Sequence, residues 1–108
     1  DYMNGNITGW TSDRYMPRLR EYHLEDIPFD FHELVGALAP RPLFVNAPTG
    51  DSNFKWESVG RVLNAARPIY SLYRKGNHIE VMHPDCGHDF PPEARERAYA
   101  LFQQYLVK

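Results

Sequence analysis

The chain has 108 residues, of which 43% are hydrophobic and 14% aromatic, and its formal net charge is −2. This content suffices for a packed core and argues against a disordered chain, while the balanced charge argues against a surface that binds nucleic acid or an anionic membrane. No apolar run approaches the roughly 18–20 residues that span a bilayer, and the single cysteine, Cys86, excludes an internal disulfide bond. The chain begins with Asp1 rather than Met, so we expect a processed chain or a fragment.

The N-terminal quarter has little regular pattern. Residues 1–28 are rich in Gly, Asn, Pro and aromatic residues, so we predict a loop-rich segment with one helical turn around residues 13–20. A helix should follow, because Asp30 is a suitable N-cap and Pro40 is expected to stop it. Its apolar positions have helical spacing: Phe31, Leu34, Val35 and Leu38.

The middle of the chain predicts a strand and a long helix. The short apolar run Leu43–Val45 is typical of a strand buried on both faces of a parallel sheet, and turn residues follow it. The next helix covers residues 56–73; Pro68 lies inside it and predicts a kink or break, and Gly76 should end it. Its apolar stripe comprises Val59, Val62, Leu63, Ala66, Ile69, Tyr70 and Tyr73.

The C-terminal part predicts a second strand in HIEVMH and a closing helix from Pro92 to Leu106. The apolar face of this helix comprises Ala94, Ala98, Leu101, Phe102, Tyr105 and Leu106. The order helix, strand, helix, strand, helix indicates parallel strands joined by a right-handed crossover, which is α/β architecture. Two strands alone leave their outer edges unpaired, so we expect further strands, either missing from this chain or supplied by a partner.

Polar residues follow both predicted strands. In open parallel sheets, functional residues gather in the loops at the carboxyl ends of the strands, and these loops contain Asp51 and His88. An acid and a histidine on neighbouring strand ends fit a hydrolytic triad, in which the histidine takes a proton from the nucleophile and the carboxylate fixes its tautomer. A turn-forming aspartate and a loop histidine bonded to its neighbours fit the same pattern.

Two stretches of the sequence, ALAPRPLFVNAPTGDSNFKW and HPDCGHDFPPEARERAYALFQQYL, resemble the C-terminal part of α/β-hydrolase-fold serine esterases. The likeness is strongest to acetyl-xylan-esterase, glucuronoyl-esterase and dienelactone-hydrolase-like members, and it covers roughly residues 29–106. It implies that residues 29–108 form the C-terminal α/β unit of one larger hydrolase domain, after the loop-rich residues 1–28. It also implies that Asp51 is the triad acid, that His88 is the triad base, and that no cofactor takes part.

The nucleophile of such an esterase is absent from the sequence. The family orders its triad as nucleophile, acid and histidine, with the nucleophile on a G-x-S-x-G-type elbow, and no such elbow occurs here. The resemblance therefore implies a chain that is inactive alone and that, in the full enzyme, acts on a small-molecule or carbohydrate ester. The alternative is a hydrolase-like domain without catalysis, which binds a partner or self-associates to complete its sheet. We expect no nucleic acid or membrane as partner.

Two other sites compete for the second loop. A metal could be held by a cluster of His83, Asp85, Cys86, His88 and Asp89. One thiol and this histidine spacing match no familiar zinc pattern, so Cys86 is better interpreted as a small packing residue.

The second competitor is a GDSL-type hydrolase. The sequences GDS and DCGH would then supply Ser52 as nucleophile, with Asp85 and His88 completing the triad. The segment between Ser52 and Asp85 is short for the strands that this fold needs, and Asn53 replaces the usual Leu after GDS.

Overall fold

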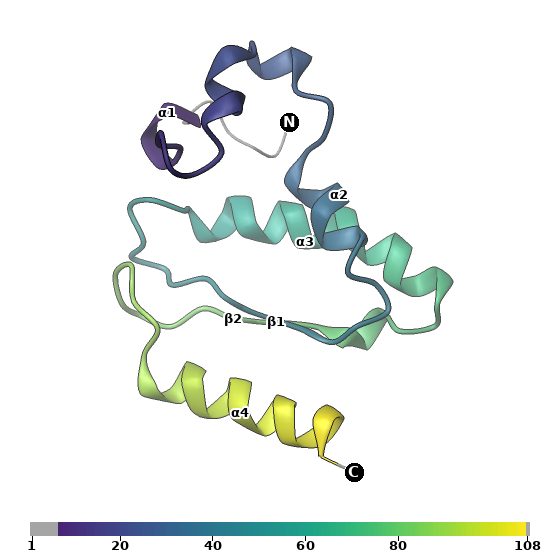
Figure 1. The fold of residues 1–108 in the computed structure, drawn as a ribbon. Helices are drawn as coiled ribbons and strands as arrows, with labels where there is room; N and C mark the ends of the chain where they lie inside the picture. The colour runs from purple at the N-terminus through teal and green to yellow at the C-terminus, as the bar shows by residue number, and fades with distance from the viewer. Residues whose placement is uncertain (1–6, 108) are drawn as a thin grey trace.

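The computed structural model describes residues 7–107, and a two-stranded parallel sheet lies at its centre (Figure 1). Strand β1 (Leu43–Asn46) pairs with strand β2 (Ile79–Met82) in the register that sets Leu43 opposite Ile79 and Asn46 opposite Met82. This mixture of helices and parallel strands confirms a partial α/β fold, in the element order that the sequence predicts.

Three helices enclose the sheet. Helix α3 (Trp56–Leu72) connects the two strands and lies on one face together with α2 (Phe31–Gly36), while α4 (Pro92–Leu106) lies on the other face (Figure 1). A parallel pair requires such a crossover, because a tight turn cannot bring the chain back to the start of the next strand.

The core forms between the sheet and α3. Alternate strand residues point to opposite faces, and Leu43, Val45 and Val81 pack toward α3 with the buried Ile79. The α3 residues that meet them are Leu63, Ala66 and Tyr70. On the opposite face, the guanidinium of Arg97 in α4 pairs with Glu80 of β2 and lowers the pKa of that carboxyl.

Helix boundaries differ from the sequence-based expectation at several positions. Asp30 caps α2 through a capping box with Glu33, as predicted, but α2 already ends at Gly36. Of the predicted kink or break at Pro68, the break is wrong, because helix α3 continues through Pro68 to Leu72. A proline ring removes one backbone donor, and the packing of the buried α3 residues on the sheet outweighs that loss.

Part of each predicted apolar stripe is exposed. Leu34 and Leu38 are both 42% exposed, and in α4 Phe102 and Leu106 are 55% and 74% exposed. A sheet of two strands offers each helix only a narrow surface to cover, so the outer part of each stripe is only partly covered by the described residues.

The N-terminal segment lies beyond α3, on the side away from the sheet (Figure 1). It contains α1 (Ile7–Trp10) and two 3₁₀ turns, η1 (Pro17–Glu21) and η2 (Leu24–Asp26), rather than a single turn over residues 13–20. The first six residues of the predicted loop-rich segment lie outside the described residues.

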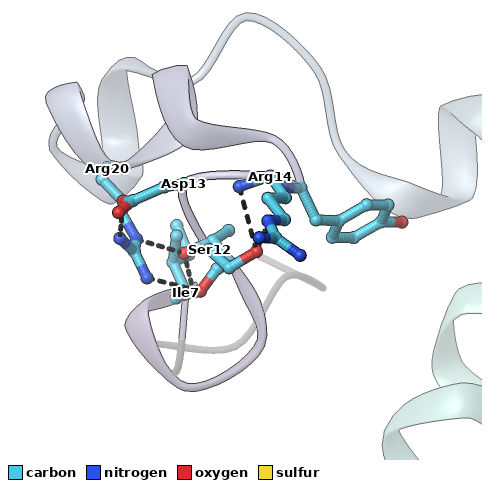
Figure 2. A network of polar contacts seen from close by, with 7 residues as sticks. Ile7, Ser12, Asp13, Arg14 and Arg20 are labelled. Atoms are coloured by element: carbon cyan, nitrogen blue, oxygen red, sulfur yellow. Dashed lines mark hydrogen bonds and ion pairs between the residues drawn. The ribbon is translucent and has the colours of Figure 1, made fainter.

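One arginine organises this N-terminal segment. The Nε of Arg20 donates to the hydroxyl of the buried Thr11 (3.0 Å), and its guanidinium also pairs with Asp13 (3.1 Å; Figure 2). Ser12 accepts the backbone N–H of Tyr15 (3.1 Å). These local bonds, rather than a long regular helix, stabilise the conformation of the segment. Within residues 7–107, no helix is both long and apolar enough to cross a membrane.

Replacement of Tyr70 by Phe tests the core. The fully buried Tyr70 hydroxyl donates to the carbonyl of Arg41 (3.0 Å), and Tyr70→Phe keeps the ring but loses this bond. We expect the free energy of unfolding of the full-length protein to fall by about 1 kcal/mol in urea denaturation. Tyr73→Phe, on the exposed end of α3, should change it by less than about 0.5 kcal/mol. Equal effects of the two variants would contradict this assignment of the core.

Candidate active site

The loops that follow β1 and β2 remain bonded to each other beyond the ends of the strands. The backbone N–H of Thr49 donates to the carbonyl of Pro84 (2.9 Å), and that of Gly50 donates to the carbonyl of Cys86 (3.0 Å). A Cβ atom at Gly50 would lie only 2.8 Å from that Cys86 oxygen, so the close approach requires glycine. The parallel pairing therefore extends to the residues just before Asp51 and His88.

Asp51 and His88 meet where this extended pairing ends. The Nδ1 of His88 lies 2.9 Å from Oδ2 of Asp51. The Asp51 side chain is 6% exposed and the His88 side chain is 64% exposed, so the acid is buried behind the imidazole. The structure thus brings together the two residues that the sequence singled out.

The Asp51 carboxylate is held in its ionised form. Burial is the largest influence on its pKa and raises it, but hydrogen bonds outweigh burial: one from His88, and two at Oδ1 from the backbone N–H groups of Phe54 (3.1 Å) and Asn53 (2.8 Å). The net result is a pKa below the usual value of an aspartate. Because Asp51 is ionised at neutral pH, Nδ1 of His88 must be the donor in their bond, which leaves Nε2 of a neutral imidazole as an acceptor.

A cavity of about 660 Å³ adjoins the pair and is lined by both Asp51 and His88. The ring of Phe54 stands over the imidazole, with 6.0 Å between the ring centroids. Most of the remaining wall is apolar and comes from α2, β1 and α3: Phe31, Val35, Val45, Val59, Val62 and Leu63. A base facing such a cavity can act on a group that enters it.

The other candidate residues of the loop after β2 have different surroundings from His88. His83 Nδ1 lies 2.9 Å from the carbonyl oxygen of Ala47, and its ring packs edge-on against Trp56 (centroids 5.0 Å apart). Partial burial, followed by the charge of Asp89, raises the pKa of the Cys86 thiol, so this cysteine is protonated at neutral pH. Among residues 7–107, His, Cys, Asp and Glu form no group of three or more that could hold a metal ion.

The GDSL-type arrangement requires Asp85 to orient His88, whereas Asp51 occupies Nδ1 of that histidine. Asp85 is an exposed loop residue.

Sequence analysis did not identify Asn46. The last residue of β1, it lines the cavity, and its Nδ2 donates to the carbonyl of Asp89 (2.8 Å). The available signal was a polar residue at the end of the predicted strand, five positions before the candidate acid.

No protein-family model matches the chain, and no curated protein matches it. Among solved structures, the chain is similar to a methylesterase, BT1017, with 30% sequence identity and a TM-score of 0.58. The match covers 69% of this chain and 17% of the methylesterase, so this chain spans a small part of that protein's length. The likeness supports an esterase-like fold.

Two glycine variants test the join between the loops. Gly50→Ala forces its Cβ against the Cys86 carbonyl, so we expect the loops to separate and the full-length protein to lose about 1–3 kcal/mol in urea denaturation. Gly87→Ala is the matched control, because a Cβ there meets nothing within 4 Å. If Gly50→Ala were as stable as Gly87→Ala, the close approach of Gly50 to the Cys86 carbonyl would be contradicted.

Removal of the imidazole should raise the pKa of Asp51. His88→Phe deletes one of three hydrogen bonds to the carboxylate and keeps a ring in front of it, so a carbon-13 NMR titration should give a higher Asp51 midpoint than in the wild type. A depressed folded-state pKa contributes stability that is present above about pH 4 and lost as pH falls through the folded pKa. The variant should therefore lose less stability on acidification. An Asp51 midpoint that stays the same, as expected for His83→Ala, would contradict the pairing.

Proposed function

We propose that this chain is the part of an α/β-hydrolase-fold serine esterase that supplies the catalytic base and the acid that orients it. The observation that carries the proposal is the bond from Nδ1 of His88 to the buried, ionised Asp51, at the carboxyl ends of two adjacent parallel strands. The similarity to a methylesterase supports ester hydrolysis as the reaction class.

Each residue then has a chemical role. Asp51 accepts a hydrogen bond from the Nδ1–H group, fixes the tautomer of His88, and stabilises the imidazolium that forms. Nε2 of His88 takes the proton of a serine hydroxyl as that oxygen attacks the ester carbonyl, and then returns it to the departing alcohol oxygen. In the second half of the cycle, the same nitrogen activates water to release the acid. No cofactor enters these steps.

The serine and the oxyanion donors belong to other parts of the full protein. The 108 residues contain no G-x-S-x-G elbow, and the chain spans 17% of the methylesterase. The partly uncovered stripes of α2 and α4 are surfaces for the remaining strands and helices of that domain. On this proposal, residues 29–108 are a unit of one larger hydrolase domain and are inactive alone.

The cavity wall suits an uncharged ester. Its aliphatic and aromatic side chains favour a small acyl or alkoxy group next to His88. A methyl ester or an acylated carbohydrate meets this requirement.

Substitutions at the pair test the roles. In the full-length protein, His88→Ala should lower kcat for a short-chain aryl ester by about 10²–10⁴-fold, because the general base is lost. Asp51→Asn should lower it to a similar extent, because the amide no longer favours the correct tautomer. Circular dichroism should show both variants folded.

The control is Cys86→Ser, which should keep kcat within about twofold, because general-base catalysis by His88 does not use the thiol. Near wild-type turnover by His88→Ala would contradict the proposal. So would clear turnover by the isolated chain that Ser52→Ala abolishes, because the nucleophile would then be Ser52.

A further inference from the structure

His88 lies in a short loop that is held on both sides by residues of the other strand's segment. Before His88, the carbonyl of Cys86 accepts the backbone N–H of Gly50 (3.0 Å). After His88, the carbonyl of Asp89 accepts the side-chain amide of Asn46 (2.8 Å). The two bonds differ in kind, since the first is made by the backbone and the second depends entirely on the identity of one side chain.

We propose that Asn46 is a positioning residue that restricts the orientation of His88 by holding the carbonyl of the next residue, Asp89. The proposal rests on the proposed hydrolase function for its kinetic consequence, but the geometry it describes is independent of any reaction.

The role of Asn46 requires its amide donor. The partner atom is a carbonyl oxygen, which can only accept, so the atom that contacts it must be Nδ2. The other end of the amide, Oδ1, is buried and accepts no hydrogen bond from the described residues. Burial of an unpartnered acceptor costs free energy. The bond to Asp89 uses Nδ2, so the donor is the part of the side chain that holds the loop.

The position of Asn46 explains why this bond affects His88. Asn46 is the last residue of β1, opposite Met82, and is therefore held by the sheet on its own side. Asp89 directly follows His88, so the bond to its carbonyl limits how far the backbone next to His88 can move. The exposed His88 side chain bonds to Asp51 and lies beside the tilted ring of Phe54. Asn46, His88 and Asp89 also line the same cavity.

The Asp51–His88 bond alone does not fix the orientation of the imidazole ring. It fixes Nδ1, but the imidazole can still swing about that contact and move Nε2 across the cavity. The bond from Asn46 to the Asp89 carbonyl restricts this movement, because it holds the backbone next to His88. Misplacement of a reacting group by about 1 Å can cost roughly 10²-fold in rate, so the anchor should affect kcat more than substrate binding.

The test uses Asn46→Leu and Asn46→Asp in the full-length protein. Both keep the approximate shape of the side chain, but leucine has no donor and an ionised aspartate can only accept, so neither donates to the Asp89 carbonyl at neutral pH. For a short-chain aryl ester, we expect kcat to fall roughly 10–100-fold with KM within about twofold. Asn64→Leu, on an exposed position of α3, is the matched control and should keep wild-type kinetics.

Two further measurements separate positioning from a general loss of stability. In proton NMR, the Nδ1–H resonance of His88, shifted downfield by Asp51, should weaken or broaden in both Asn46 variants and stay unchanged in Asn64→Leu. In a His88→Gln background, Asn46→Leu should cause no further loss of the residual rate, because it acts through His88.

Lower stability with unchanged kcat and an unchanged Nδ1–H resonance would overturn the proposal. So would a full further loss of rate in the His88→Gln background. If the wild-type protein hydrolyses no ester, the hydrolase proposal fails, and the Nδ1–H resonance then decides the role of Asn46 by itself.

Discussion

The parallel pairing of β1 with β2 determines where the polar residues of this chain can meet. Parallel strands place their carboxyl ends at the same edge of a sheet, and here the ladder continues past both strands through Thr49 and Gly50. The residues that follow this ladder lie close to each other, because its hydrogen bonds hold the two loops together. Asp51 and His88 are those residues. The core beneath α3 stabilises the sheet, and the sheet in turn fixes the distance between acid and histidine.

The asymmetry in exposure gives the pair its chemical character. The Asp51 side chain is 6% exposed and its negative charge is stabilised by three hydrogen bonds, whereas the His88 side chain is 64% exposed and meets a mostly apolar cavity. A buried carboxylate of this kind cannot easily act on a substrate, but it can hold a neighbouring imidazole in one tautomer. The exposed imidazole lies on the open side of the pair, and this difference between the two residues follows from burial and bonding.

Much of the fold could be predicted from the sequence, because the signals were local and strong. The apolar run at Leu43–Val45, the stripe of α3 and the prolines before α4 each indicate one element, and the order of the elements implies parallel strands. The candidates Asp51 and His88 followed from their positions after the strands. Their bond, however, depends on the register of β1 with β2, which no local pattern encodes.

The remaining features depend on tertiary contacts. Pro68 does not break α3, because core packing holds the helix before the proline, at Leu63 and Ala66, and after it, at Tyr70. The amphipathic patterns of α2 and α4 mark surfaces wider than a two-stranded sheet can cover, so part of each stripe is exposed. Asn46 was missed because its partner, Asp89, is distant in sequence.

On the proposed function, a serine outside these 108 residues completes the pair. The most direct measurement is to label the full-length protein with an alkyl fluorophosphonate, map the labelled peptide by mass spectrometry, and compare it with His88→Ala. We expect one labelled serine outside this chain, with labelling strongly reduced in the variant. Labelling of Ser52, or labelling of an outside serine that does not depend on His88, would contradict the proposed function.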